Sequence, residues 1–238
     1  MKRATPPNGP TTRRFQTCAL ACVLGSSLLT GCALPQYRPG KQLADQSSLP
    51  TYMALLRNRN PDQCRLTQRI LLRVGRKDLD MTGYLYLQPG DAWVALALGD
   101  MGMELFRLRF DDNRGEVIRK PDSMPANPLR NGIIRDIQHL FGWGSASNTY
   151  LVERRNAETG LVLEHGDGSL EEYGFAKGGS APVRSIGVSN RRIVREAVYS
   201  SPMKHSGTEH PLPGRIVLRN HKWRYTMEIV LLQVRAAR

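Results

Sequence analysis

Hydrophobic and polar residues alternate over most of the chain beyond residue 66, with the period of two that indicates β-strands. The alternation is plainest where Arg107 and Arg109 separate Phe106, Leu108 and Phe110. Short turn signals separate the runs, so neighbouring strands are expected to pair antiparallel. The predicted strands are 66–74, 79–88, 92–98, 103–110, 150–154, 160–165, 169–175, 182–188, 192–199, 215–219 and 222–234.

Two segments instead repeat their apolar residues at helical spacing. In the first, Leu49, Tyr52, Met53 and Leu56 form one stripe behind a Ser-Ser cap. The second follows Pro128 and is expected to end at Gly142. Its apolar stripe comprises Leu129, Ile133, Ile137, Leu140 and Phe141, and its opposite, water-facing side is predicted to carry Arg130, Arg135, Asp136 and Gln138.

This pattern predicts a mainly β (α+β) domain. A sheet of roughly ten to eleven strands curls or closes, so we expect a strongly curved antiparallel sheet or incomplete barrel with a helical lid. Ala95 and Ala97 share a strand face with Trp93. These small side chains either leave space inside the curved sheet or pack against bulky partners, and the pattern does not distinguish the two.

The N-terminus has the three parts of an export signal. Lys2, Arg3, Arg13 and Arg14 precede an apolar run over 18–29 that is too short to span a bilayer. The tetrapeptide over 29–32, Leu-Thr-Gly-Cys, then predicts a lipoprotein signal peptide over 1–31 with lipid attached to Cys32. The alternative is an ordinary cleaved signal that carries this tetrapeptide by chance.

Beyond Cys32 the residues to 48 are polar and punctuated by Pro35, Pro39 and Gly40, which predicts a tether over 32–48 and a folded domain over 49–238. The residues directly after Cys32 are Ala33 and Leu34. The absence of an acidic residue there is typical of sorting to the outer membrane.

The chain is basic, with a formal net charge of +13. Four basic residues lie in the predicted signal, which leaves 30 basic against 21 acidic residues, or about +9. Outside the cytoplasm the available polyanions are phospholipid and lipopolysaccharide head groups, so no nucleic-acid partner is expected. The charge is equally consistent with a membrane-facing surface and with a solvated one. Cys64 alone remains in the domain, which excludes an intramolecular disulfide and a thiolate metal site.

Catalytic and metal-binding patterns are weak. The five histidines show no paired ligand spacing, and the His205/His210 pair lies in a predicted loop. No Gly-x-Ser-x-Gly frame is present. Glu171 and Glu172 are consecutive on a strand and should point to opposite faces. We therefore predict no enzyme, no metal site and no cofactor; an enzyme would need a buried polar cluster that the sequence does not reveal.

Two parts of the chain resemble a known family. The first part comprises residues 83–96 (GYLYLQPGDAWVAL) and 99–105 (GDMGMEL), and the second comprises residues 211–218 (PLPGRIVL) leading into 223–234. The first resembles the central hairpins, and the second the closing hairpin, of the outer-membrane lipoproteins of the LolA/LolB-like superfamily, especially its uncharacterised LolB-like relatives. The resemblance implies an incomplete barrel with a helical lid and an apolar cavity for acyl chains. It also implies that Met101, at the tip of a turn, contacts the membrane.

These observations lead to a hypothesis: a lipid-anchored carrier or acceptor, facing the periplasm at the outer membrane, that binds acyl chains of lipids or lipoproteins. Membrane lipid or acylated cargo would be its partner, a periplasmic carrier protein is a further candidate, and a monomer is expected. The alternative is a structural or accessory lipoprotein whose basic face, with Arg107 and Arg109, docks a protein complex or lipopolysaccharide. The predicted cavity-lining residues are Leu72, Leu85, Leu87, Trp93, Phe106, Leu108, Phe110, Ile133, Ile137, Met227 and Ile229.

Overall fold

The computed structural model describes residues 33–58, 63–112, 114–122, 124–141, 146–154, 158–203 and 212–236. Leu34–Arg238 forms one compact unit. The predicted signal peptide over 1–31 and the predicted lipidation site Cys32 lie outside the described residues. Among the helices that the structure describes, none is long and apolar enough to cross a membrane.

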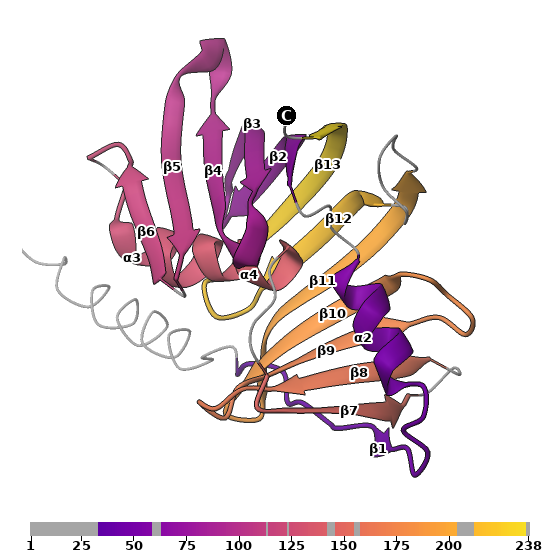
Figure 1. Ribbon diagram of the computed structural model, residues 1–238. Coiled ribbons are helices and arrows are strands. Elements are labelled where there is room, and N and C mark those ends of the chain that lie inside the picture. Colours follow the sequence, from indigo (N-terminus) through magenta and orange to yellow (C-terminus); the bar gives the residue numbers. More distant parts are fainter. Residues whose placement is uncertain are drawn as a thin grey trace, which may run out of the picture. The chain divides into compact units, whose positions relative to one another are not determined.

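Thirteen strands form one antiparallel sheet in the described part of the chain (Figure 1). Their order across the sheet is β1-β7-β8-β9-β10-β11-β12-β13-β2-β3-β4-β5-β6, so β1 and β6 are the two edges and the sheet stays open. The strands are β1 (Lys41–Gln42), β2 (Cys64–Val74), β3 (Lys77–Leu87), β4 (Trp93–Leu98), β5 (Glu104–Asp111), β6 (Arg114–Arg119), β7 (Asn148–Glu153), β8 (Thr159–Glu164), β9 (Leu170–Phe175), β10 (Pro182–Ser189), β11 (Arg192–Met203), β12 (Leu212–Asn220) and β13 (Tyr225–Ala236).

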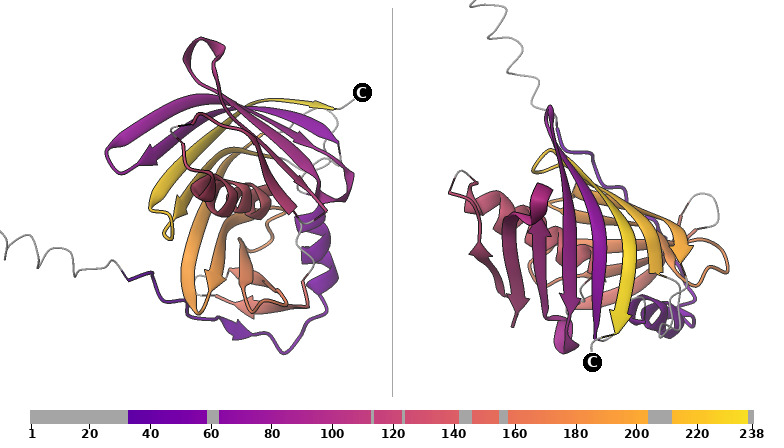
Figure 2. Two further views of the ribbon diagram at one scale, coloured as in Figure 1. Left: turned by 90° about the vertical axis from the view of Figure 1, so that its left-hand side faces the viewer. Right: turned by 90° about the horizontal axis from the view of Figure 1, so that it is seen from above.

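The two edge strands are the ones that the alternation pattern missed. β1 has two residues, which is too short for any periodicity, and both are exposed. In β6, Val117 packs against the core while Ile118 is 46% exposed, so apolar and polar positions do not separate cleanly by face. The other strands, their antiparallel pairing and the strong curvature of the sheet agree with the prediction (Figure 2).

Helices cover the concave face of the sheet. Helix α2 (Leu49–Arg57) packs on β7, β8 and β9, with the Tyr52 ring edge-on to Phe175 at 5.0 Å between ring centroids. The second helical segment comprises α3 (Ala126–Pro128), the π-helical turn η3 (Leu129–Ile134) and α4 (Arg135–Phe141), and is called the lid helix below. It connects edge strand β6 to β7 near the opposite edge. Because of this connection it crosses the concave face, as Figure 2 shows.

The main core lies between the lid helix and the inner face of β2–β5 and β11–β13. Leu108 and Leu218 have no exposed surface, and Trp93 is stacked on Phe110 with 5.7 Å between ring centroids. A smaller apolar cluster under α2 contains Leu56. The inward positions are those that the period of two selects, because successive strand residues face opposite sides of the sheet.

The segment predicted as a tether differs from the expectation over residues 34–48, which are attached to the sheet. β1 pairs with β7, and Gln36 makes an isolated bridge with Arg192. Tyr37 is buried, and its hydroxyl donates a hydrogen bond of 2.8 Å to Glu172 Oε2. These polar residues have partners across the fold that composition does not reveal, so a free tether does not extend through this stretch.

Candidate functional site

An apolar cavity of about 40 Å³ lies between the lid helix and the inner face of β2, β3, β4, β5 and β13. The small side chains of Ala95 and Ala97 line it, which answers the question that the alternation pattern left open. Gln68 brings an amide to this otherwise largely apolar wall and is 4% exposed. Of the predicted lining residues, Leu72, Leu85, Phe106, Ile133, Ile137, Met227 and Ile229 surround this cavity.

The four other predicted lining residues lie elsewhere. Leu87, Trp93 and Leu108 are buried in the core beside the cavity. In the strand register Trp93 stands opposite Leu87 and Phe110, so these large side chains form one filled layer. The Trp93 indole Nε1 donates to Gln138 Oε1 of the lid helix at 2.9 Å, which ties this layer to the lid. Phe110 lines a separate cleft described below.

The cavity is too small for an acyl chain in this structure. Pockets that hold drug-sized ligands have volumes of roughly 300–1,000 Å³, whereas a water molecule takes about 30 Å³ in the liquid. A space of about 40 Å³ therefore has room for no more than a few water molecules. Entry of an acyl chain requires the lid helix to move away from β2–β5, or the lining side chains to repack.

The opposite side of the lid helix is held to β9–β13 by buried polar contacts. Asp136 has no exposed surface, and each of its carboxylate oxygens accepts a hydrogen bond of 3.0 Å from Asn220 Nδ2. The Tyr225 hydroxyl donates to Asp136 Oδ2, and Arg195 Nε lies 3.6 Å from Oδ1. Burial raises the pKa of Asp136, whereas Arg195 and the two hydrogen-bond donors oppose that rise. These contacts fix one point of the lid on the sheet.

The burial of Asp136 corrects the helical-wheel prediction, which placed this residue on the water-facing side. The sheet curls around the lid helix, so two faces of the helix contact strands (Figure 2). Helical periodicity identifies one apolar stripe and assigns the remaining positions of the helix to water. A charged residue can occupy the second contact because Arg195, Asn220 and Tyr225 supply its partners.

A second buried polar chain holds the lid one turn further along. His139 Nδ1 lies 3.0 Å from Glu171 Oε1, and His139 Nε2 lies 2.8 Å from Ser185 Oγ. The Tyr173 hydroxyl donates to Glu171 Oε2 at 2.8 Å and lies 3.1 Å from the His139 carbonyl oxygen. Burial alone would raise the pKa of Glu171, but His139, Arg195 and the Tyr173 hydrogen bond together lower it to about 2. Glu172 points to the other face, as strand alternation predicts, and pairs with Arg154.

Ser185, His139 and Glu171 are connected in the order of a serine-hydrolase triad. A nucleophile must reach a substrate carbonyl, yet Ser185 and His139 have no exposed surface and Ser185 Oγ also bonds the Tyr199 hydroxyl at 2.8 Å. His139 belongs to the lid, so a lid movement that uncovered Ser185 would also carry the base away from it. The geometry supports a structural role, in which the contacts of His139 with Ser185 and Glu171 hold the lid helix on the sheet. Sequence reasoning missed this cluster because its members are separated by up to 46 residues.

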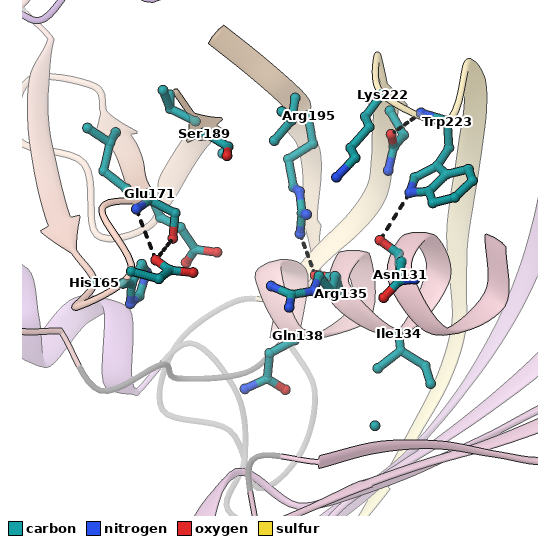
Figure 3. A pocket seen from close by; sticks show the side chains of 18 of the residues that line it. Asn131, Ile134, Arg135, Gln138, His165, Glu171, Ser189, Arg195, Lys222 and Trp223 are labelled. Carbon is teal, nitrogen blue, oxygen red and sulfur yellow. Dashed lines mark hydrogen bonds between the residues drawn. The ribbon is translucent and has the colours of Figure 1, made fainter. Parts of the chain in front are cut away.

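A larger cleft of about 680 Å³, called the polar cleft below, lies on the side of the lid away from the apolar cavity. Five residues of the lid line it: Arg130, Asn131, Ile134, Arg135 and Gln138. The other wall comes from the turns β8–β9, β10–β11 and β12–β13 and the adjoining strand ends (Figure 3). Among the described residues no group of three or more His, Cys, Asp or Glu side chains could hold a metal ion. The predicted loop pair His205 and His210 lies outside those residues.

Met101 lies at the tip of the β4–β5 hairpin, which extends past the neighbouring strands in Figure 1. Its side chain is fully exposed, and Met103 beside it is 65% exposed. The backbone of Met101 has φ 57°, a left-handed conformation that is uncommon for a residue with a side chain. Gly102 continues the turn with φ 76°, where glycine is favoured. The turn thus presents an apolar side chain directly to the surroundings.

The basic residues named for the alternative hypothesis are paired. Arg107 Nη2 lies 3.0 Å from Glu104 Oε2, and Arg109 Nη2 lies 2.7 Å from Glu116 Oε2. Each arginine therefore has a neighbouring carboxylate that offsets its charge. This part of the convex face is less positive than the count of arginines indicated.

Comparisons with known proteins show a likeness in fold. No protein-family model matches the chain, and no curated protein matches it in sequence. A LolA superfamily protein from Nitrosomonas europaea superposes with a TM-score of 0.53 at 12% identity, over 78% of this chain and 93% of that one. A DUF1329 family protein from Desulfovibrio piger superposes with a TM-score of 0.51 at 12% identity, over 80% and 92%.

The fold is LolA-like. The curved open sheet and its helical cover are thus an arrangement that solved proteins share with this chain. At 12% identity this likeness concerns the fold alone, so the narrower LolB-like assignment stays a prediction. The roles of Met101 and of the cavity-lining residues also remain predictions.

Proposed function

We propose that this LolA-like protein is a carrier or acceptor that binds acyl chains of lipids or lipoproteins between the lid helix and the inner face of β2–β5 and β13. The observation that carries the proposal is the cavity of about 40 Å³, lined mainly by apolar residues, under a helix that crosses an open sheet. Transfer of an acyl chain from a bilayer to such a space exchanges one apolar setting for another. The gain of about 25 cal/mol per Å² relative to water therefore largely cancels, and hand-off can be reversible without an energy source.

A direct test is binding of a fluorescent fatty-acid probe to the unlipidated chain 33–238, which contains the compact unit. We expect saturable binding that is weakened about tenfold by Ile137→Asp, because the new carboxylate would have to be desolvated beside the chain. Ile137 is half-buried, lines the cavity and belongs to the lid. Ile118→Asp on β6 is the matched control, since Ile118 is 46% exposed outside the cavity. Absence of saturable binding by the unmodified chain would refute the acyl-carrier function.

We further propose that Met101 inserts into the membrane during hand-off. We expect Met101→Asp to reduce co-sedimentation of the unlipidated chain with phospholipid vesicles about tenfold, because burying a methionine side chain contributes about 1.5–3 kcal/mol. Its melting temperature should stay unchanged, because the side chain is fully exposed. Val198→Asp on β11 replaces another exposed apolar residue, 55% exposed, and should leave vesicle binding intact. Equal losses from both substitutions would remove the special role of the hairpin tip.

Lipid on Cys32 is proposed to anchor the protein at the outer membrane, facing the periplasm. Cys32→Ser should move the protein from the outer-membrane fraction to the soluble or inner-membrane fractions, because two or three acyl chains provide stable anchoring that one exposed methionine does not. Fractionation with an antibody against the domain measures this, and Cys64→Ser is the control for loss of a cysteine. A Cys32→Ser protein that still fractionates fully with outer membranes would show that lipidation is not the anchor.

A further inference from the structure

The polar cleft gathers positive charge from three separate parts of the fold. Arg130 and Arg135 come from the lid helix, Arg195 from β11 and Lys222 from the turn between β12 and β13. In Figure 3 the side chain of Arg195 approaches the cleft from β11, that of Lys222 from the β12–β13 turn, and that of Arg135 from the lid. The cleft volume of about 680 Å³ falls within the range of roughly 300–1,000 Å³ typical of ligand sites.

Three of these cations lack a carboxylate partner. Across the residues that the structure describes, no ion pair joins Arg130, Arg135 or Lys222 to an acid. Elsewhere on the surface, arginines such as Arg69 and Arg215 are paired with Asp80 and Glu228. Unpaired cations around a concave surface produce a positive potential that attracts anions.

The acids that line the polar cleft already accept hydrogen bonds. Asp167 accepts from the Ser169 hydroxyl at 2.6 Å and from the Ser169 backbone N–H at 2.9 Å, and the pKa of its carboxyl is lowered chiefly by these bonds. Glu171 accepts a hydrogen bond from the Tyr173 hydroxyl and contacts His139 of the lid helix. Arg135 lowers the pKa of Asp167 and Arg195 lowers that of Glu171, so the two carboxylates offset part of the positive charge. Four basic side chains line the cleft against these two acids, which leaves an excess of positive charge.

Arg195 is held in place before any ligand arrives. Its Nη1 donates a hydrogen bond of 2.6 Å to the Arg135 carbonyl oxygen, and its side chain passes over Gly187. A Cβ on Gly187 would lie 2.7 Å from Arg195 Cγ, so glycine at this β10 position makes room for the arginine. A guanidinium positioned by the fold loses less conformational entropy when it binds an anion.

The lid helix places this positive cleft back to back with the apolar cavity. Positions 130, 131, 134, 135 and 138 line the cleft, whereas 133, 137 and 141 line the cavity. Phe110, Ile134 and Trp223 add apolar wall within the cleft itself. An amphiphile with an anionic head group and acyl chains matches this division of polar and apolar surface around one helix.

We propose that the polar cleft binds a phosphate-type anion through Arg135, Lys222 and Arg195, and that this anion is the head group of the lipid handled by the protein. The inference rests on the proposed acyl-binding function for its second part, because free phosphate would satisfy the same three cations. Arginine pairs with phosphate oxygens through two parallel N–H donors, and lysine adds a point charge. The cargo is then a phosphate-bearing lipid in preference to a neutral one.

Calorimetric titration of the chain 33–238 with three probes tests this. The probes are monooctanoylglycerol phosphate, monooctanoylglycerol and inorganic phosphate; the first two differ only in the phosphate group. We expect the phosphorylated lipid to bind at least about tenfold more tightly than its neutral counterpart, which corresponds to about 1.4 kcal/mol. The double variant Arg135→Gln/Lys222→Gln should lose this preference while binding of the neutral lipid is unchanged.

Arg73→Gln is the matched control. Arg73 is 55% exposed on β2, its Nε lies 3.5 Å from Asp78 Oδ2, and it does not line the polar cleft, so its loss removes one positive charge from another part of the surface. The preference for the phosphorylated lipid should survive this substitution. It should also fall as salt concentration rises, because exposed charges are screened.

The outcomes separate this inference from the proposed function. Equal affinities for the two lipids, unchanged in the double variant, would overturn the anion site while leaving the acyl carrier intact. Binding of inorganic phosphate that the double variant abolishes, without binding of either lipid or of the fatty-acid probe, would support the anion site with free phosphate as its ligand and refute the carrier. A preference that Arg73→Gln abolishes equally would assign the effect to overall charge and overturn the site.

Discussion

Oxidation of a protein carrying Gly115→Cys and Ile134→Cys is expected to weaken binding of the fatty-acid probe strongly. Gly115 lies on edge strand β6 and Ile134 on the lid helix. An ideal Cβ on Gly115 would stand 3.6 Å from Ile134 Cβ, within the range of about 3.5–4.5 Å that disulfides require. The bond would hold the lid on β6 and keep the cavity at about 40 Å³. We expect an affinity loss of about 100-fold, or about 2.7 kcal/mol.

The reduced double variant is the internal control, because it carries the same substitutions without the bond. Treatment with a reductant should restore binding to the level of that form. Cys64 should not interfere, since it is buried and burial raises the pKa of its thiol to about 11. Full affinity in the oxidised form would show that acyl chains enter without a lid movement, through side-chain repacking alone.

Asp136→Ala is expected to lower the free energy of unfolding by about 3–5 kcal/mol, the cost of removing one partner from a buried ion pair. Total stabilities are about 5–15 kcal/mol, so this loss is a large fraction of the whole. The reason is that Asn220 and Tyr225 would each lose a hydrogen-bond acceptor inside the fold, and Arg195 would lose its carboxylate partner. Urea denaturation followed by circular dichroism measures the change.

Asp80→Ala provides the comparison. Asp80 also bonds an arginine on a neighbouring strand, Arg69, but the two side chains are 46% and 66% exposed. Exposed pairs contribute about 0–1 kcal/mol, so this variant should remain close to the unmodified protein. If Asp136→Ala costs no more than Asp80→Ala, the polar contacts do not hold the lid, and its position depends on the apolar stripe.

The lid helix shows how far sequence reasoning reached. Its apolar stripe, including Ile133 and Ile137, follows from helical periodicity, and these residues do face the cavity. The partners of its polar residues do not follow, because Asp136 contacts Asn220, and His139 contacts Ser185, across long stretches of chain. Contacts of this kind depend on how strands from both halves of the sheet meet around one helix.

The lining of the cavity was also predicted only in part from the sequence. Alternation selects the inward-facing residues of β3–β5 correctly, but it gives no position along the strand at which filled core ends and space begins. Trp93 lies in the filled part, because its ring stacks on Phe110 and its indole N–H donates to Gln138. Seven predicted lining residues therefore surround the cavity, and Leu87, Trp93 and Leu108 belong to the filled core.

The sequence by itself determined the strand alternation, the two apolar helix stripes and the curved antiparallel sheet, because these depend on residue spacing within short segments. The tertiary structure decided three further features: the small volume of the cavity, the buried polar contacts of Asp136 and His139 that hold the lid helix, and the convergence of Arg135, Arg195 and Lys222 at one cleft. Each depends on residues far apart in the chain, whose proximity is set by the curvature of the sheet around the lid and by the packing of side chains between them.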